Sequence, residues 1–333
     1  MIKNLNERIM EIRSFNKNIM GNTQYIPRNL MLEVTNDCNS KCIFCANRNM
    51  TRKRNFINKD IVTKALKQSR ELGIKELGLY TNGESLLNTN IDDYIGQAKE
   101  LSYDYIYITT NGILANKEKV RKLFKLGLSS IKFSINSIEE KNYVAMQGVD
   151  CFNIVMENLK SVYHMKEENF PDRKVYVSYI KTKFNNYQNS EIKRMFQKYC
   201  DNISIQDVRN QGGLIANIED LALGTKNNIK LPCFYPFNSI VVTCEGYVTA
   251  CCMDFQNYLV YGDLNKDSLK DIWNNNVING FREKQLNEKV ENTICANCYQ
   301  NKFKECEALL QHLSCKIDFE DWRKNGKIIR SCK

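Results

Sequence analysis

Residues 35–45 read TNDCNSKCIFC and place three cysteines, Cys38, Cys42 and Cys45, within eight positions in the spacing C-x3-C-x2-C. This stretch directly follows the apolar run 30–34, which predicts a buried β-strand that ends in a cysteine-bearing loop. Structural zinc sites take four protein ligands, whereas three cysteines on a [4Fe–4S] cluster leave one iron open to an outside ligand. The spacing therefore favours a cluster whose open iron binds a substrate or cosubstrate.

Two other interpretations of this loop are a structural zinc site and three unrelated cysteines in a cysteine-rich chain. The absence of a fourth ligand nearby in the sequence disfavours the zinc site. Features elsewhere in the sequence are needed to distinguish a cluster site from three unrelated cysteines.

The composition describes a globular chain that is rich in cysteine. It has 333 residues, of which 43% are hydrophobic. No apolar run approaches the ~20 residues of a transmembrane helix, and residues 1–8 lack the apolar core of a signal peptide. We therefore expect a cytosolic protein. In that reducing compartment, fourteen cysteines indicate metal binding rather than disulfides.

The formal charge is +10, from 48 basic and 38 acidic residues, and the basic residues are scattered along predicted helices. This pattern is typical of solvated helix faces, although an anionic substrate or an acidic partner segment in a basic cleft would also fit. No nucleic-acid-binding motif is present, so we expect neither a nucleic-acid nor a membrane partner. The two histidines, His164 and His312, lie in predicted helical segments, which argues against histidine acid–base catalysis.

Strands and helices alternate along residues 30–208. Strands are predicted at 30–34, 76–81, 105–110, 130–135, 174–182 and 203–208, and helices at 59–72, 91–101, 117–126, around 155–163 and at 190–199, with a further helix at 1–20. Crossover helices imply that the strands are parallel. Six units are too few for a closed eight-stranded barrel, and the alternation alone fits a doubly wound sheet as well.

Polar residues follow several of these strands. The stretch 81–85, Thr-Asn-Gly-Glu-Ser, comes after the second strand and Asn111 after the third, while Ser134 and Asn136 share a face at the end of the fourth. Functional residues of parallel barrels gather at the carboxyl ends of the strands. Turn chemistry and strand-end capping would explain the same residue types, so both interpretations stay open at this point.

A second group of cysteines follows Pro232. Cys233 and Cys251 flank a predicted β-hairpin turned at 245–246, and Cys295 and Cys298 supply a C-x2-C pair. Together they would ligate one [4Fe–4S] cluster completely, or one zinc ion.

Four further cysteines bear on this second site. Cys252 adjoins Cys251 and is its rival as a ligand. Cys306, Cys315 and Cys332 remain for a second auxiliary cluster, and we do not expect one because their spacings of x7, x8 and x16 are long.

Both cysteine groups resemble those of the radical S-adenosylmethionine (SAM) superfamily. The spacing C-x3-C-x2-C, with an aromatic residue before the third cysteine, is similar to its signature. Gly83-Glu84 looks like its G-G-E-P motif, with Asn82 and Ser85 as departures. The pattern C-x12-G-x4-C followed by C-x2-C resembles the SPASM or shorter twitch domain. The resemblance implies an α/β fold, a partial (β/α)6 TIM-type barrel with a small C-terminal β-hairpin-plus-helix iron–sulfur domain.

The resemblance also implies roles for individual residues. A catalytic [4Fe–4S] cluster would bind SAM at its open iron, and an external one-electron reductant such as flavodoxin or ferredoxin would supply the electron that cleaves SAM. Glu84 would accept from the ammonium of the SAM methionyl group, Phe44 would pack beside the adenine, and Ser134 and Asn136 would face the ribose and carboxylate. The implied metal ligands are Cys38, Cys42, Cys45, Cys233, Cys251, Cys295 and Cys298, and the implied SAM-binding residues are Phe44, Asn82, Gly83, Glu84, Asn111, Ser134 and Asn136.

The expected organisation is an N-terminal helix and lead-in at 1–27, the barrel at 28–225 and the auxiliary-cluster domain with a helical tail at 226–333. Relatives of this size with one auxiliary cluster include dehydrogenases of amino-sugar-like alcohols. We therefore expect oxidation of a small sugar-like or cyclitol substrate. The alternatives are a peptide or protein maturase, a radical epimerase, and a non-catalytic iron–sulfur or zinc scaffold protein.

Overall fold

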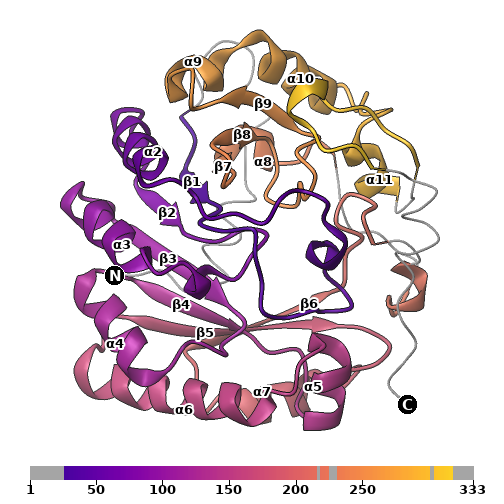
Figure 1. Ribbon diagram of the computed structural model, residues 1–333. Coiled ribbons are helices and arrows are strands. Elements are labelled where there is room, and N and C mark those ends of the chain that lie inside the picture. Colours follow the sequence, from indigo (N-terminus) through magenta and orange to yellow (C-terminus); the bar gives the residue numbers. More distant parts are fainter. Residues whose placement is uncertain (1–25, 216–217, 225–230, 301–303, 318–333) are drawn as a thin grey trace.

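The parts of the chain that this computed structural model describes, residues 26–215, 218–224, 231–300 and 304–317, contain nine strands in one sheet. The strand order is β6-β5-β4-β3-β2-β1-β7-β8-β9. The strands are β1 (Asn29–Leu32), β2 (Glu76–Gly78), β3 (Tyr105–Thr110), β4 (Ser130–Ser134), β5 (Lys174–Lys181), β6 (Asn202–Asp207), β7 (Ser239–Val242), β8 (Tyr247–Thr249) and β9 (Val260–Asp263). Strands β1 to β6 pair in parallel with their neighbours, which gives a curved and open barrel wall (Figure 1).

Helices cover the outside of this wall (Figure 1). The helices are α2 (Lys59–Glu71), α3 (Ile91–Glu100), α4 (Lys117–Leu126), α5 (Glu140–Gln147), α6 (Phe152–Asn169), α7 (Asn189–Phe196), α8 (Tyr235–Asn238), α9 (Leu269–Asn274), α10 (Asn276–Leu286) and α11 (Ile294–Gln300). Short 3-10 helices include η2 (Ala46–Asn49) and η3 (Ser85–Leu87). Within the described residues, no helix is both long and apolar enough to span a bilayer.

The two faces of the barrel wall differ in chemistry because side chains alternate along each strand. One face is apolar, and its residues, such as Ile106, Ile108 and Ile131, are fully buried in the main core. The other face is lined by tyrosines and hydroxyl groups, and there the Tyr105 hydroxyl donates to Ser130 Oγ at 2.7 Å. This inner face is therefore built for polar contacts rather than for packing alone.

The partial barrel predicted from the sequence is confirmed, with small differences in its elements. Strand β2 ends at Gly78 rather than at residue 81, although the Leu79 backbone N–H still donates to the Tyr107 carbonyl oxygen at 2.9 Å. Helix α5 was not predicted from the sequence. It is short, its buried residues are only Tyr143, Met146 and Gln147, and no side chain caps its start. The helix predicted at 1–20 lies outside the described residues.

The hairpin predicted around residues 245–246 is present, and its first strand also pairs with the barrel sheet, which the sequence did not indicate. Strand β7 pairs with β8 antiparallel, and Gly246 adopts φ of 88° at the turn. Strand β7 also pairs in parallel with β1, over Asn29↔Ser239 to Leu32↔Val242. The C-terminal region therefore continues the barrel sheet, and the predicted boundary between 225 and 226 remains a prediction.

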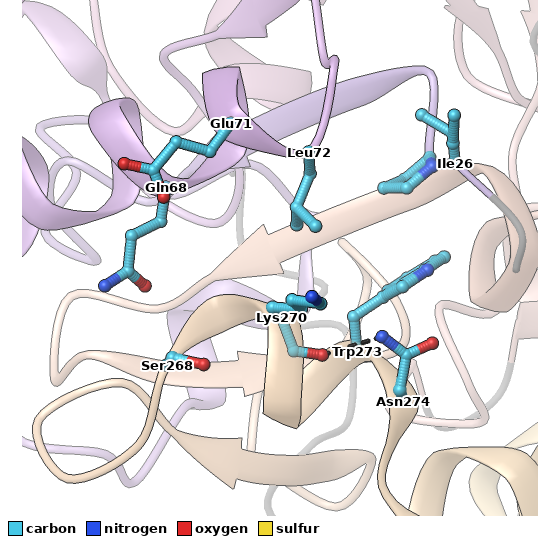
Figure 2. Close-up of a pocket in the computed structure, with 9 residues that line it drawn as sticks. Ile26, Gln68, Glu71, Leu72, Ser268, Lys270, Trp273 and Asn274 are labelled. Carbon is cyan, nitrogen blue, oxygen red and sulfur yellow. Dashed lines mark hydrogen bonds between the residues drawn. The ribbon is translucent and has the colours of Figure 1, made fainter.

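A pocket of about 490 Å³ lies between the end of α2 and helix α9, and Figure 2 shows Ile26, Leu72 and Trp273 among the side chains around it. The residues before β1 and the last turn of α2 lie at the amino ends of the parallel strands. Functional residues of such barrels gather at the opposite end. We therefore assign no ligand to this pocket.

An ion-pair network joins the barrel to the C-terminal hairpin. The Arg52 guanidinium contacts Glu33, which follows β1, and Glu245 in the β7–β8 turn, where Nε lies 2.9 Å from Oε1. Glu33 Oε2 also accepts from the backbone N–H of Cys244 at 3.0 Å. Arg52 and Glu33 are 2% and 1% exposed, so each needs the other to offset the cost of burying its charge.

We expect the substitution Arg52→Met to lower the free energy of unfolding by about 3–5 kcal/mol, because it leaves the Glu33 carboxylate buried without a partner. Urea unfolding followed by circular dichroism under anaerobic conditions measures this change. The matched control is Lys59→Met, which removes the exposed ion pair with Asp93 and should cost no more than about 1 kcal/mol. Equal effects of the two substitutions would contradict a structural role for the buried network.

Candidate active site and auxiliary metal centre

The loop that carries the first three cysteines is held by the C-terminal end of α5. The backbone N–H groups of Lys41 and Ile43 donate to the carbonyl oxygens of Gln147 and Met146, each at 3.0 Å. The Cys42 thiol also donates to Gln147 Oε1 at 2.6 Å. A helix that the sequence did not reveal therefore positions the cysteine loop.

The three thiols of this loop are half-buried and face one another closely enough to interact electrostatically. Burial raises the pKa of Cys38 to about 12 and also raises the pKa values of Cys42 and Cys45. For Cys42, the charges of Cys45 and Cys38 raise the pKa further. Three thiolates at this position need a cationic centre to offset their repulsion, so the donor set fits an iron–sulfur cluster with three cysteine ligands.

The turn at Gly83 packs directly on the start of the cysteine loop. A β-carbon at Gly83 would lie 2.3 Å from the Thr35 carbonyl oxygen and 2.5 Å from that of Asp37. The Glu84 backbone N–H donates to the Asp37 carbonyl oxygen at 2.8 Å. Only glycine therefore allows the second strand's loop to approach the cysteine loop this closely.

Glu84 is 3% exposed, and its carboxylate is held by three donors at the strand ends. Oε1 accepts from the Thr110 hydroxyl at 2.8 Å and from the Leu86 backbone N–H at 3.0 Å, and Oε2 accepts from the Asn111 backbone N–H at 2.7 Å. Burial raises the pKa of Glu84, and these donors act in the opposite direction. A carboxylate can accept about four hydrogen bonds, so one position remains for a ligand such as an ammonium group.

Asn111 and Asn82 lie on either side of Glu84 and also contact the cysteine loop or its supports. Asn111 Nδ2 donates to Asn39 Oδ1 at 2.7 Å and to Ser40 Oγ at 3.1 Å. Asn82 is buried, and its Oδ1 has no hydrogen-bond partner among the described residues. The structure thus gathers Asn82, Gly83, Glu84 and Asn111 around the three cysteines.

The other predicted SAM-binding residues have structural contacts of their own. Phe44 is 5% exposed and belongs to the main apolar core. Asn136 Oδ1 accepts from the Ile180 backbone N–H at 2.8 Å and so holds the end of β5. Ser134 lies on the inner face and shares a hydrogen bond of 3.1 Å with Ser178. Their predicted contacts with SAM remain predictions.

The second set of cysteines also comes together, from three separate elements. Cys233 precedes α8, Cys251 follows β8, and Cys295 and Cys298 lie on α11. Burial raises the pKa values of Cys233, Cys295 and Cys298, while a side-chain hydrogen bond with Cys252, followed by burial, raises the pKa of Cys251. For Cys295 the charges of Cys233 and Cys298 raise the pKa further. Four half-buried thiols that repel one another when ionised fit a fully ligated metal centre.

Cys251 and Cys252 form a side-chain hydrogen bond with each other and differ in their other neighbours. Cys251 interacts with Cys233 and Cys295 and packs against the main core. Cys252 packs with Met31 and Val241 in a separate small cluster on the inner face of the barrel, where Tyr80 and Tyr235 also lie. Cys252 also lies near Cys233, so the choice of Cys251 over Cys252 as the ligand remains a prediction from the spacing.

Cys306 and Cys315 share one charged neighbour, Asp254, and differ in the others. The charged groups near Cys306 are Asp254 and Glu305, and those near Cys315 include Arg52 and Glu245. Cys332 lies outside the described residues, so a second auxiliary cluster stays untested.

The segment after β6 links the two metal centres and was not singled out from the sequence. Gln211 donates to the Phe44 carbonyl oxygen at 3.0 Å and accepts from the Ala46 backbone N–H at 2.8 Å. Its neighbour Asn210 donates to the Asn297 carbonyl oxygen on α11 at 2.8 Å. The sequence did contain a signal for a role of this segment, because residues 209–213 follow the carboxyl end of a predicted parallel strand, where functional residues of such barrels gather.

Two family models match the two cysteine-bearing regions. The model of the radical SAM superfamily matches residues 32–196, and the SPASM model, an iron–sulfur cluster-binding domain, matches residues 233–299. The chain belongs to the radical SAM superfamily. Its radical SAM and SPASM domains imply SAM and iron–sulfur clusters as cofactors, one of the clusters being of the SPASM auxiliary type.

Curated relatives match part of the chain. A probable GTP 3',8-cyclase from Saccharolobus solfataricus is 30% identical over 132 residues, which cover 40% of this chain and 42% of that protein. A probable GTP 3',8-cyclase from Sulfurisphaera tokodaii is 27% identical over 131 residues, 39% of this chain and 41% of that protein. The match thus spans less than half the length of these relatives.

Solved structures share the fold over most of the chain. BtrN in complex with AdoMet and 2-DOIA has a TM-score of 0.56 at 18% identity, covering 86% of this chain and 99% of that one. Streptococcus suis SuiB bound to precursor peptide SuiA has a TM-score of 0.60 at 18% identity, covering 84% and 71%. Native anSMEcpe with bound AdoMet has a TM-score of 0.59 at 12% identity, covering 90% and 96%. At these identities the likeness concerns the fold alone.

We expect Gly83→Ala to weaken SAM binding at least about tenfold, because the added methyl group pushes Glu84 away from the cysteine loop. Equilibrium dialysis of SAM against the reconstituted protein measures this change. The matched control is Gly96→Ala in α3, where nothing lies within 4 Å of the new β-carbon and alanine should stabilise the helix by about 0.5–1 kcal/mol. Unchanged SAM affinity in Gly83→Ala would show that this contact is not needed.

Proposed function

We propose that this protein reductively cleaves SAM and uses the resulting 5'-deoxyadenosyl radical to oxidise a small sugar-like or cyclitol substrate. Cys38, Cys42 and Cys45 are the proposed ligands of the catalytic cluster. Glu84 is the proposed acceptor for the SAM ammonium group. In this proposal an external one-electron reductant, such as a flavodoxin or ferredoxin, supplies the electron for SAM cleavage.

The observation that carries the proposal is the position of the second cysteine set against the barrel interior. Cys251 lies near enough to Cys233 and Cys295 to interact with them electrostatically, while the adjacent Cys252 packs on the inner face with Met31 and Val241. A centre held by four cysteines has no open position for substrate. Its place beside the barrel interior suits a role as electron acceptor.

The oxidation removes two hydrogens from the substrate. One leaves as a hydrogen atom to 5'-deoxyadenosine, and the other leaves as a proton together with one electron. When bound, SAM and the clusters supply the radical and the acceptor for that electron. The polypeptide orients the reactants and excludes water.

The inner face of the barrel suits a ring-shaped polyhydroxylated substrate. The rings of Tyr80 and Tyr107 lie 5.6 Å apart, and those of Tyr105 and Tyr107 lie 5.7 Å apart. The hydroxyl groups of Ser134 and Ser178 lie on the same face of the wall, nearer the carboxyl ends of the strands. Aromatic faces combined with a few polar groups are typical of small-molecule sites.

We expect about eight irons per chain after anaerobic reconstitution, four in each of two [4Fe–4S] clusters. Replacing Cys38, Cys42 and Cys45 together by alanine should leave about four, and so should Cys251→Ala. The matched control, Cys252→Ala, should keep about eight. Iron analysis with Mössbauer spectroscopy measures these contents. Twelve irons in the parent protein would contradict the two-cluster assignment, and a loss of four in Cys252→Ala would make Cys252 the ligand.

The reaction is tested by anaerobic turnover with deuterated sugars and cyclitols, measuring 5'-deoxyadenosine, SAM consumed and product. Oxidation should consume one SAM per product and carry substrate deuterium into 5'-deoxyadenosine. A product that gains a solvent hydrogen at the same carbon would indicate epimerisation instead. Modification of a peptide alone would overturn the sugar or cyclitol assignment.

A further inference from the structure

Lys132 occupies the middle of the barrel's inner face. It is the central residue of β4, and its neighbours Ile131 and Phe133 point to the opposite face and belong to the main core. The strand register pairs Lys132 with Thr109 of β3 and with Tyr176 of β5. Lys132 therefore lies one inward-facing position deeper in the barrel than Ser134.

The Lys132 ammonium has no carboxylate partner in the described part of the chain. It lies 5.7 Å from the centre of the Tyr80 ring, and no hydrogen bond or ion pair satisfies it there. The titratable groups that face it include the thiol of Cys252, Tyr80 and its register partner Tyr176. Burial lowers the pKa of Lys132, because the surroundings disfavour its charged form.

Lys166, a buried lysine elsewhere in the fold, shows how carboxylate partners satisfy an ammonium group. The Lys166 side chain is 2% exposed, and its Nζ lies 2.6 Å from Glu167 Oε1 and 2.8 Å from Asp201 Oδ1. These partners raise the pKa of Lys166, overcoming the opposing effect of burial. Lys166 thus has two carboxylate partners, whereas Lys132 has none within the described residues and has the Cys252 thiol nearby.

A second unsatisfied polar group lies beside Lys132. The Thr109 hydroxyl is buried and has no hydrogen-bond partner among the described residues, although Thr109 is the register partner of Lys132. The Thr109 hydroxyl is buried without a partner, and the ammonium of the half-buried Lys132 has no carboxylate partner among the described residues. A bound anion would satisfy both groups, since anionic oxygens accept hydrogen bonds from each. Two such groups side by side point to a ligand.

We propose that Lys132 and Thr109 bind an anionic group of the substrate, a phosphate or a carboxylate, inside the barrel next to the Tyr80 ring. This proposal rests on the proposed function and narrows its substrate to a small molecule that carries such a group. Lys132 is then a specificity-determining residue that places the substrate ring below the SAM site.

The test measures binding of two probes, inorganic phosphate and acetate, to the holoenzyme with SAM bound. Equilibrium dialysis with radiolabelled anions at constant ionic strength compares the parent protein with Lys132→Met and Lys132→Arg. The matched control is Lys160→Met, because Lys160 also lies over a tyrosine ring, Tyr199, but is exposed on α6. The two anions separate a phosphate-bearing from a carboxylate-bearing substrate.

We expect saturable binding of one anion per chain, weakened at least about tenfold in Lys132→Met, largely retained in Lys132→Arg and unchanged in Lys160→Met. SAM affinity and iron content should stay at parent levels in all variants. If neither anion binds the parent protein saturably, or if Lys132→Met binds it equally well, the proposal is overturned.

Two further outcomes would show that Lys132 has a different role, and each would also overturn the proposal. Weaker SAM binding in Lys132→Met would make it a SAM contact. An altered reduction potential of the auxiliary cluster, with anion binding unchanged, would make it a partner of that cluster through Cys252. Because anion binding is measured without turnover, failure of the oxidation itself is seen separately, in the deuterium experiment.

Discussion

The backbone contact between the Gly83–Glu84 turn and the start of the cysteine loop is the constraint on which the site depends. Parallel strands bring their carboxyl ends to one edge, so the loops after β1, β2 and β3 meet there. The missing side chain at Gly83 lets the Glu84 N–H reach the Asp37 carbonyl oxygen. The Glu84 carboxylate then binds Thr110 and Asn111, which ties three consecutive loops into one rigid unit.

The second cysteine set is held against this unit by strand pairing, ion pairs and hydrogen bonds, and not by a flexible linker alone. Strand β7 extends the barrel sheet beside β1, and the Arg52 ion pairs join the two strands at their carboxyl ends. Gln211 forms hydrogen bonds with the backbone of the cysteine loop, next to a residue that contacts α11. The relative position of the two cysteine sets is therefore set by hydrogen bonds and ion pairs, as within a single core.

Local patterns in the sequence predicted much of this arrangement. Cysteine spacing, strand–helix alternation and the polar residues after β2 are properties of neighbouring residues, so they can be read without the fold. The close approach at Gly83, the support from Gln147 and the bridge through Gln211 depend on contacts across more than forty residues. Lys132 could be predicted only in part. Alternation places it on the same face as Ser134, but the structure is needed to show that no carboxylate among the described residues faces it.

The parallel pairing of β1 with β7 joins segments about 200 residues apart in the chain. During synthesis, the first cysteine loop leaves the ribosome long before the strand that completes its side of the sheet. Contacts between such distant segments form late in folding. The first three thiols are thus present in a nascent chain whose wall is still missing β7. The later set that ends at Cys298 is complete only after β7 itself has been synthesised, so the first cysteine loop exists for a time without either its neighbouring strand or the second set.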